Sequence, residues 1–259
     1  MLHLQAFKNS LQCSNLSQIA RYPWAMKTEA TILIPFLKPD NFFCEAISSI
    51  GQSCSGNADI LLVGPKSLDN EKLSKVYEIV EKTEIEYRVF LASTRNVAQA
   101  LNVGLSHIST EFVVRFDSDD IMLPERISRQ ISFLRENPEV GAVGGQISLI
   151  TSKGFPRIWP RVHYPTDKSV LRKKMLEGCF LAHPSVTMRT EVVKSLGGYR
   201  EWFDSAEDYD LWLRMLKRSE LANLESKVIK YRQHKNQASR KVTEVSKFTA
   251  AALQSFLKD

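Results

Sequence analysis

Short apolar runs alternate with segments of helical spacing along the chain from residue 29 onward. The first run is ended by Pro and Lys, the second stops at Gly64-Pro65 and the fourth leads directly into Asp117, as expected for buried strands. These runs predict strands over residues 31–36, 59–63, 87–91 and 111–116. The segments between them predict helices over 40–50, over 68–82 and from Ser93 or Thr94 to about 106, with Asp40 or Asn41 as the first N-cap. Repeated strand–helix units predict a parallel sheet covered by helices.

The second half of the chain is less regular. Pro124 suits the first turn of a helix, whose buried stripe we expect at Ile127, Ile131 and Leu134. Further strands are predicted over 140–150, 182–188 and 227–231. Further helices are predicted up to Gly197-Gly198, over 207–218, and at the end of the chain with Val245, Phe248, Ala252 and Phe256 on one face. Residues 151–180 are basic, rich in proline and without a clear period.

Three parts of the chain follow from this pattern. We expect an extension over 1–28, one α/β domain over 29–236, and a helix over 237–259 that packs on the domain. The extension mixes polar and apolar residues without a period. Met26 stands just before the first strong strand, so translation could start at Met1 or at Met26.

Composition narrows the class of protein. Of the 259 residues, 43% are hydrophobic and 25% are charged, which is typical of a soluble globular protein and excludes a disordered chain or a disulfide scaffold. The four cysteines have no zinc-site or redox spacing, no apolar run is long enough to span a bilayer, and residues 1–27 do not resemble a signal peptide. We therefore expect a reduced, cytoplasmic protein.

The net charge of +6 suits phosphate groups, nucleic acid or an anionic membrane surface, although a basic surface also favours solubility without any partner. Nucleic acid is the weakest of these interpretations, because no aromatic and basic platform accompanies the charge.

An acidic cluster, residues 117–120, directly follows a buried strand. Ligands of open α/β sheets bind beyond the carboxyl ends of the strands, so this position favours a binding site. Carboxylates are the ligands that Mg²⁺ and Mn²⁺ prefer. Asp119 is then a direct ligand, and Asp117 reaches a sugar hydroxyl or the ion. The alternative is a solvated acidic turn in which Asp120 caps the following helix.

A second acidic cluster opens the helix predicted over 207–218. Asp208 and Glu207 are the candidates for a general base. Acids in the first turn of a helix are also favoured by its dipole, which is the structural alternative. Asp210 could be a structural or solvent-facing acid.

Two histidines, His183 and His234, adjoin predicted strands and could face the same site, although a lone histidine is more often structural. The chain has no Ser/His/Asp order, no phosphate-binding loop, no zinc pattern and no dinucleotide fingerprint.

The order of these signals resembles the family 2 glycosyltransferases, which use nucleotide-sugar donors and have the GT-A fold. The resemblance covers about residues 29–236. It rests on TILIPF (31–36), SSIGQS (48–53), the run from Ala100 to Gly145 that contains DSDD and LPER, AHPSV (182–186), GGYRE (197–201), AEDYDLWLRM (206–215) and YRQH (231–234). It implies a Rossmann-like single domain with a mixed, mainly parallel central sheet.

The resemblance also implies residue roles on the donor side. Pro35 and Phe36 would line the nucleotide pocket, and Asp117 and Asp119 match the DxD motif that binds the metal and the nucleotide sugar. His234 lies in the segment that closes over the diphosphate, where it would join the metal site. The implied cofactor is Mg²⁺ or Mn²⁺.

On the acceptor side, Asp208 matches the catalytic base, with Glu207 beside it. His183 would begin a strand near the acceptor, and Trp212 would lie on the same side. The implied reaction is an inverting transfer of a sugar, with a hexose favoured, from a UDP-sugar donor to a hydroxyl of a glycan or lipid-linked acceptor. Polysaccharide biosynthesis is the family's common setting.

One stretch departs from the family pattern. Relatives carry two acids and a Gly-Ser after the second strand, where an Asp contacts the nucleobase. Here Gly64-Pro65 replaces the acids, while Ser67 and Asp69 remain in register. Lys66 could meet a phosphate, another base or solvent.

The departure motivates an alternative function, a non-catalytic binding protein for a glycan or nucleotide sugar. A nucleotidyltransferase of similar architecture is disfavoured, because it needs a loop rich in Gly and Arg after the first strand. Basic residues cluster in 157–174 and 227–241, beside the expected acceptor side. They favour diphosphate groups and an anionic membrane surface as partners, and a location at the inner face of the membrane.

Overall fold

The computed structural model describes residues 18–20 and 28–258, apart from 55–56, 161, 204 and 236–241. The possible start at Met26, most of the predicted N-terminal extension and the basic residues Arg161, Arg240 and Lys241 lie outside the described residues. So does the side chain of Val245 in the C-terminal helix.

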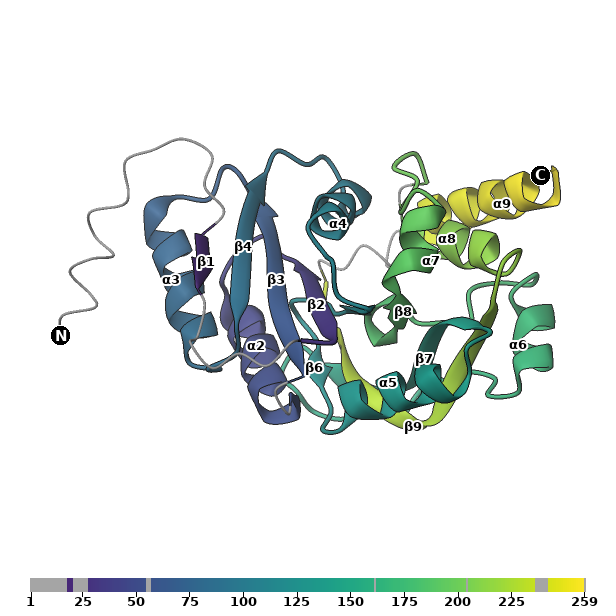
Figure 1. The fold of residues 1–259 in the computed structure, drawn as a ribbon, viewed down its shortest axis with the longest axis horizontal. Coiled ribbons are helices and arrows are strands. Elements are labelled where there is room, and N and C mark those ends of the chain that lie inside the picture. The colour runs from purple at the N-terminus through teal and green to yellow at the C-terminus, as the bar shows by residue number, and fades with distance from the viewer. Residues whose placement is uncertain are drawn as a thin grey trace.

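A single nine-stranded sheet organises the described residues, in the order β1-β4-β3-β2-β5-β8-β7-β9-β6 (Figure 1). Its strands are β1 (Gln18–Ala20), β2 (Ala30–Pro35), β3 (Ala58–Pro65), β4 (Tyr87–Ala92), β5 (Phe112–Arg115), β6 (Ile121–Met122), β7 (Val140–Thr151), β8 (Thr187–Arg189) and β9 (Glu220–Gln233). Six strands, β2, β3, β4, β5, β7 and β9, run in one direction, and β1, β6 and β8 run against them. The prediction of a mixed, mainly parallel sheet is confirmed.

Helices cover both faces of this sheet (Figure 1). They are α2 (Asn41–Ser53), α3 (Asn70–Glu81), α4 (Val97–Ser106), α5 (Arg126–Glu136), α6 (Lys168–Lys174), α7 (Thr190–Ser195), α8 (Glu207–Met215) and α9 (Val242–Lys258). Buried side chains of α2, α3 and α5 form one apolar core, and those of α4, α6, α7, α8 and α9 form a second. Strand β2 separates them, because Ile32 and Ile34 point into the first core and Leu33 points into the second.

The predicted helices are mostly confirmed, and their caps explain the boundaries. The carboxylate of Asp40 accepts hydrogen bonds from the first amides of α2, as predicted for its N-cap. The prediction of Ser93 or Thr94 as the cap of α4 is wrong, because the side chain of Asn96 accepts the hydrogen bond from the amide of Gln99. Helix α5 begins two residues after Pro124, and its buried stripe contains Ile127, Ile131 and Leu134 as expected.

The segment 182–188 differs from the expected strand. Residues His183–Ser185 form a 3₁₀ turn, and only Thr187–Arg189 pair as β8, against β5 and β7. Pro184 has no amide hydrogen to contribute to a ladder, which explains why the strand begins after it. The last predicted strand is part of the longer β9, and no described helix is long and apolar enough to cross a membrane.

Candidate active site

Three carboxylates meet at the carboxyl end of β5. Asp117, Asp119 and Asp120 each place a carboxylate oxygen within 4.8 Å of those of the others. All four residues of β5 are buried, and the strand delivers the acids to the end of the sheet where its parallel neighbour β2, and β3 beyond it, also end. This is the position predicted from the sequence.

Asp120 is the most buried acid of the cluster, with no exposed surface. One of its oxygens accepts the backbone amide of Arg232 at 2.8 Å, and its Oδ2 has no hydrogen-bond partner. Burial, followed by the charges of Asp117 and Asp119, raises its pKa well above the ordinary range. The alternative role as a helix cap is wrong, because the N-cap residue of α5 is Glu125.

Asp119 links the cluster to the end of β9. Its Oδ2 lies 2.7 Å from Nε2 of His234, and its carbonyl oxygen accepts a 2.7 Å hydrogen bond from Nε of Arg232. Burial and the neighbouring Asp117 raise the pKa of Asp119, whereas His234 opposes this rise. The predicted grouping of Asp117, Asp119 and His234 is therefore present in the structure.

Asp117 forms an ion pair with Arg115, the last residue of β5, at 2.7 Å. The guanidinium of Arg115 is buried, and its Nε has no hydrogen-bond partner. Its charge lowers the pKa of Asp119 and also that of Asp208, on a different element of the fold. The charge of Arg115 therefore acts both on the acidic cluster and on Asp208.

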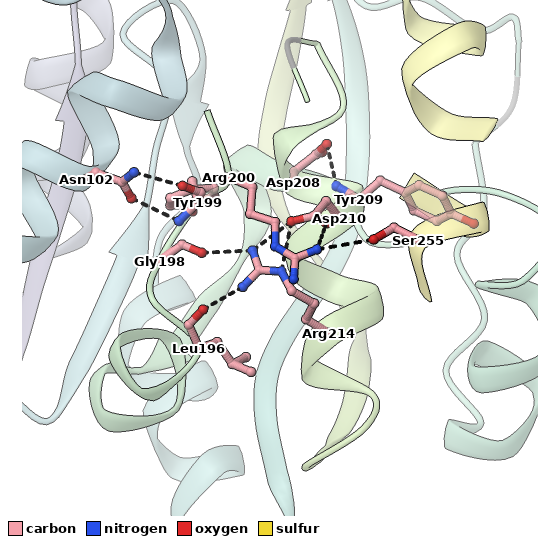
Figure 2. A network of polar contacts seen from close by, with 10 residues as sticks. All are labelled: Asn102, Leu196, Gly198, Tyr199, Arg200, Asp208, Tyr209, Asp210, Arg214 and Ser255. Carbon is pink, nitrogen blue, oxygen red and sulfur yellow. Dashed lines mark hydrogen bonds and ion pairs between the residues drawn. The ribbon is translucent and has the colours of Figure 1, made fainter. Parts of the chain in front are cut away.

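Asp208 lies in the first turn of α8 and is partly buried. Its Oδ1 accepts a 2.7 Å hydrogen bond from the backbone amide of Tyr209 (Figure 2). Burial raises the pKa of Asp208 to about 6, and the charge of Asp117 adds to this rise. A carboxylate with such a pKa is suited to accept a proton near neutral pH. Its neighbour Glu207 is more buried, with 7% of its surface exposed.

Asp210 has a structural role, which settles one open alternative. Its carboxylate accepts a 2.8 Å hydrogen bond from Nε of Arg214 and lies 3.4 Å from Arg200. Arg214 also donates to the carbonyl oxygens of Leu196 and Gly198, and thus fixes the segment that leads into α8 (Figure 2). In Figure 2 Asp208 is bonded to the amide of Tyr209 and not to this network. Its carboxylate is therefore not held in an ion pair with Arg200 or Arg214.

The two residues predicted on the acceptor side are buried. Trp212 has no exposed surface and contacts His183 edge-on, with ring centroids 5.9 Å apart. Nε2 of His183 lies 2.9 Å from the hydroxyl of Tyr199. Burial and the charge of Arg115 hold the pKa of His183 well below its usual range, which favours the neutral ring. Both side chains are buried, and their assignment to the acceptor side stays a prediction.

Pro35 ends β2 and Phe36 follows it, one residue short of the predicted strand end, and the Phe36 ring points inward. Only 4% of its surface is exposed, and it packs on Phe43 with ring centroids 5.2 Å apart. It also fills the space above Gly64 in β3. The aromatic ring and the missing side chain at Gly64 are thus two parts of one packing arrangement. The roles of Pro35 and Phe36 toward a nucleotide stay a prediction.

Three buried arginines support the site, and the residue pattern predicts none of them at this position. Arg115 pairs with Asp117. Arg126 donates to the carbonyl oxygens of Arg115 and Val186, and Arg232 donates to that of Asp119. Arg126 stands in the LPER stretch and Arg232 in the YRQH stretch, but nothing in the residue pattern distinguishes a buried arginine from an exposed one.

The acidic cluster fits a divalent cation. It offers hard oxygen ligands from Asp117, Asp119 and Asp120 within one small region, which is the donor set that Mg²⁺ and Mn²⁺ prefer. The unpartnered Oδ2 of buried Asp120 and the raised pKa of Asp119 both indicate negative charge that a cation would offset.

Comparisons with known proteins agree with this geometry. The model of Glycosyl transferase family 2 matches residues 31–197. The chain is 29% identical over 181 residues to the O-antigen biosynthesis glycosyltransferase WbnJ of Escherichia coli. The matched stretch covers 68% of this chain and 69% of that protein. The chain spans only 38 to 46% of the length of three further relatives, all described as uncharacterized glycosyltransferases.

Solved structures show the same fold at low sequence identity. The mannosyltransferase PcManGT from Pyrobaculum calidifontis, in complex with GDP-Man and Mn²⁺, has a TM-score of 0.68 at 16% identity, over 100% of this chain and 71% of that one. S. aureus TarS 1-349, in complex with UDP-GlcNAc, has a TM-score of 0.64 at 18% identity, over 88% of this chain and 66% of that one.

Proposed function

Because the chain belongs to glycosyl transferase family 2, we propose that it transfers one sugar from a nucleotide-diphosphate donor to a hydroxyl group of a glycan or lipid-linked acceptor. Its fold is of the GT-A type, as in the structural neighbours. One observation carries the proposal. Arg115 couples a carboxylate cluster suited to a cation with Asp208, an acid whose pKa of about 6 suits a base.

The donor is proposed to bind at the end of β5. TarS has been solved with UDP-GlcNAc and PcManGT with GDP-Man and Mn²⁺, which supports a nucleotide sugar and a divalent cation here. Asp117 and Asp119 would hold the cation, with His234 orienting Asp119 or joining the ligand set. A bound divalent cation supplies positive charge that offsets the charge on the departing diphosphate. A UDP-sugar with Mg²⁺ or Mn²⁺ is the proposed pairing.

Asp208 is proposed to accept the proton of the acceptor hydroxyl as that oxygen attacks the anomeric carbon. In a single displacement, the new bond forms on the face opposite the leaving diphosphate, so the anomeric configuration inverts. Asp208 fits this role because it is partly exposed and its carboxylate keeps capacity to accept a proton. Glu207 and Arg115 would shape the charge around it, and buried His183 and Trp212 would support that side of the site.

The acceptor is proposed to be a hexose-containing glycan or its lipid-linked precursor, at the cytoplasmic face of the membrane. The name of WbnJ places that relative in O-antigen biosynthesis, which supports polysaccharide biosynthesis as the setting. No nucleic acid is proposed as a partner.

A panel of nucleotide sugars tests the proposal. Binding and hydrolysis of each donor are measured with Mg²⁺, with Mn²⁺ and with a chelator. We expect one donor, with UDP-GlcNAc and UDP-glucose tested first, to bind and hydrolyse slowly in the presence of metal. Binding without hydrolysis or transfer for every donor would favour the alternative, a non-catalytic protein of the same fold, which the buried Phe36 and the acid-free Gly64-Pro65 motivate. Absence of binding for every donor would contradict both the transfer proposal and a non-catalytic protein that binds nucleotide sugars.

A further inference from the structure

A tight hairpin follows β7 and returns beside its last residues. The amide of Thr151 donates to the carbonyl oxygen of Phe155 at 2.9 Å, and the amide of Arg157 donates to that of Leu149 at 2.8 Å. Gly154 takes the left-handed conformation that the turn needs, with φ of 83°. Ile150 and Pro156 form a β-bridge across the hairpin. The backbone at the base of the segment is therefore fixed by hydrogen bonds.

This hairpin displays large apolar side chains to solvent. Phe155 is 66% exposed, Ile158 is 73% exposed and Trp159 is 70% exposed, all within five residues of the chain. Exposed apolar residues scattered singly need no explanation, whereas several that are close together are typical of an interaction site. Aromatic side chains flanked by cations are typical of the boundary between lipid and water.

The charge of the hairpin has one sign. Residues 151–163 contain no acid, and Lys153 and Arg157 are exposed between the apolar side chains. Each cation near an anionic membrane surface adds to the attraction. A second copy of the same basic hairpin would be repelled by this charge, so the complementary partner is anionic.

The hairpin starts beside the candidate active site. Thr151 at its base pairs in register with Gln233 of β9, and the next residue along, His234, reaches Asp119 at 2.7 Å. The guanidinium of Arg232 joins the two directly, because it donates to the carbonyl oxygens of both Asp119 and Ser152. A membrane surface bound by the hairpin would therefore lie close to the acidic cluster.

We propose that residues 151–160 dock this protein on an anionic phospholipid bilayer. Phe155, Ile158 and Trp159 enter the headgroup region, and Lys153 and Arg157 meet lipid phosphates. Docking in this way brings the acidic cluster to the bilayer surface, where the headgroup of a lipid-linked acceptor lies. The inference goes beyond the proposed function, and its test requires no sugar transfer.

Vesicle co-sedimentation of the full chain tests the inference. The probes are vesicles of phosphatidylcholine alone and of phosphatidylcholine with phosphatidylglycerol. We expect binding to the anionic vesicles and a loss of about tenfold or more in Phe155→Ser/Ile158→Ser, because two exposed apolar side chains no longer enter the bilayer. Leu257→Ser is the matched control, since Leu257 is 69% exposed on α9 and should leave binding unchanged. Thermal unfolding of each variant confirms that it is folded.

The charge of the hairpin is tested separately. Lys153→Ala/Arg157→Ala should weaken binding and reduce its dependence on salt, whereas Lys173→Ala/Arg218→Ala removes the same charge elsewhere and should have a much smaller effect. Three results would overturn the inference: no binding of the wild type to anionic vesicles, equal binding by Phe155→Ser/Ile158→Ser, or a dimer that this variant abolishes while vesicle binding stays intact. Failure of sugar transfer with retained vesicle binding would contradict only the proposed function.

Discussion

A β-carbon at position 64 would lie 2.4 Å from Cζ of Phe36, so the Phe36 ring occupies the space that a side chain there requires. Phe36 follows β2 and Gly64 lies in β3, its parallel neighbour. The ring also packs on Phe43 of α2, which limits its freedom to move away. Glycine at position 64 and phenylalanine at position 36 therefore depend on each other, next to the end of β2 where the nucleotide pocket is predicted.

This dependence predicts a non-additive pair of substitutions. Gly64→Ala should lower the free energy of unfolding by about 1–3 kcal/mol, because the added methyl group overpacks against the ring. The same change in a Phe36→Leu background should cost much less, since the shorter side chain frees that space. Denaturant unfolding of the two single variants and the double variant measures the coupling. Gly51→Ala is the control, because its added methyl group would meet only ordinary contacts at 3.5 Å or more in α2. Strict additivity would contradict the packing argument.

Asp208→Asn should retain donor binding and lose turnover. The amide keeps the shape of the side chain but cannot accept the proton of the acceptor hydroxyl, so kcat should fall by about 10²- to 10⁴-fold. Titration calorimetry with donor and metal, together with transfer assays, separates binding from chemistry. Glu225→Gln, a change to an acid outside the site, serves as the control. Full activity of Asp208→Asn would refute the assignment of the base.

The pKa of Asp208 predicts the acidic side of the pH profile. With a pKa of about 6, its basic form is lost as pH falls through this value, so kcat/KM should fall about tenfold for each further pH unit. The substitution of Arg115 by Met should move this limb to higher pH, because the Arg115 charge lowers the pKa of Asp208. A limb that stays in place in a folded Arg115→Met variant would contradict the coupling between them.

The same shift has a consequence for stability, with the opposite sign from an ordinary ion-paired acid. Because folding raises the pKa of Asp208 above its ordinary value, the stabilising contribution is present at low pH and is lost as pH rises through about 6. Asp208→Asn should therefore be more stable than the wild type at pH 8, by a margin that shrinks toward pH 4. Unfolding in denaturant at both values measures the difference. A margin that grows toward pH 4 would contradict the raised pKa.

The parts that could be predicted from sequence are those set by local pattern. Strand β5 and the acids that follow it form one continuous run of residues, so their position at the sheet edge follows from the apolar run alone. That the charge of Arg115 acts on Asp208 could not be predicted from such patterns, because it depends on how α8 packs in the core that it shares with β5. The 3₁₀ turn at His183 was missed for a related reason, since an apolar run interrupted by proline fits both a strand and a turn.

Arg126 illustrates the largest gap between sequence and structure. An arginine in the first turn of an amphipathic helix resembles a solvated residue, yet 1% of its surface is exposed. Its Nη2 donates to the carbonyl oxygen of Arg115 at 2.7 Å and to that of Val186 at 3.3 Å, and its Nε donates to Gln130. Main-chain acceptors carry no sequence signature, so this contact between β5 and the start of β8 is visible only in the fold.

Arg126→Met should destabilise the protein by about 1–3 kcal/mol, because it removes the side-chain donor to the buried carbonyl oxygen of Arg115 and to Gln130. Burial lowers the pKa of Arg126 to about 9, so the free energy of unfolding should rise as pH increases through that value. Here the folded pKa lies below the ordinary value, and the buried group favours the neutral form. Below pH 9 the buried charge of Arg126 lowers the free energy of unfolding, and Arg126→Met removes this cost. The variant is therefore less stable only if the loss of the hydrogen bonds outweighs that gain. Arg129→Met, on the exposed face of α5, should change stability by less than about 1 kcal/mol. Equal effects of the two variants in denaturant unfolding would contradict the role of Arg126.

Asp119 and His234 should contribute unequally to metal-dependent donor binding. Asp119→Ala removes a carboxylate from the acidic cluster and should abolish the difference in donor affinity between metal and chelator. His234→Ala removes the 2.7 Å contact to Asp119 and leaves all three carboxylates in place, so metal dependence should persist with weaker affinity. Donor affinity measured over a range of Mn²⁺ concentrations distinguishes the two, because loss of a positioning contact shifts the curve while loss of the cluster flattens it. A flat curve for His234→Ala would make the histidine a direct ligand, and unchanged metal dependence in Asp119→Ala would refute the donor site at the end of β5.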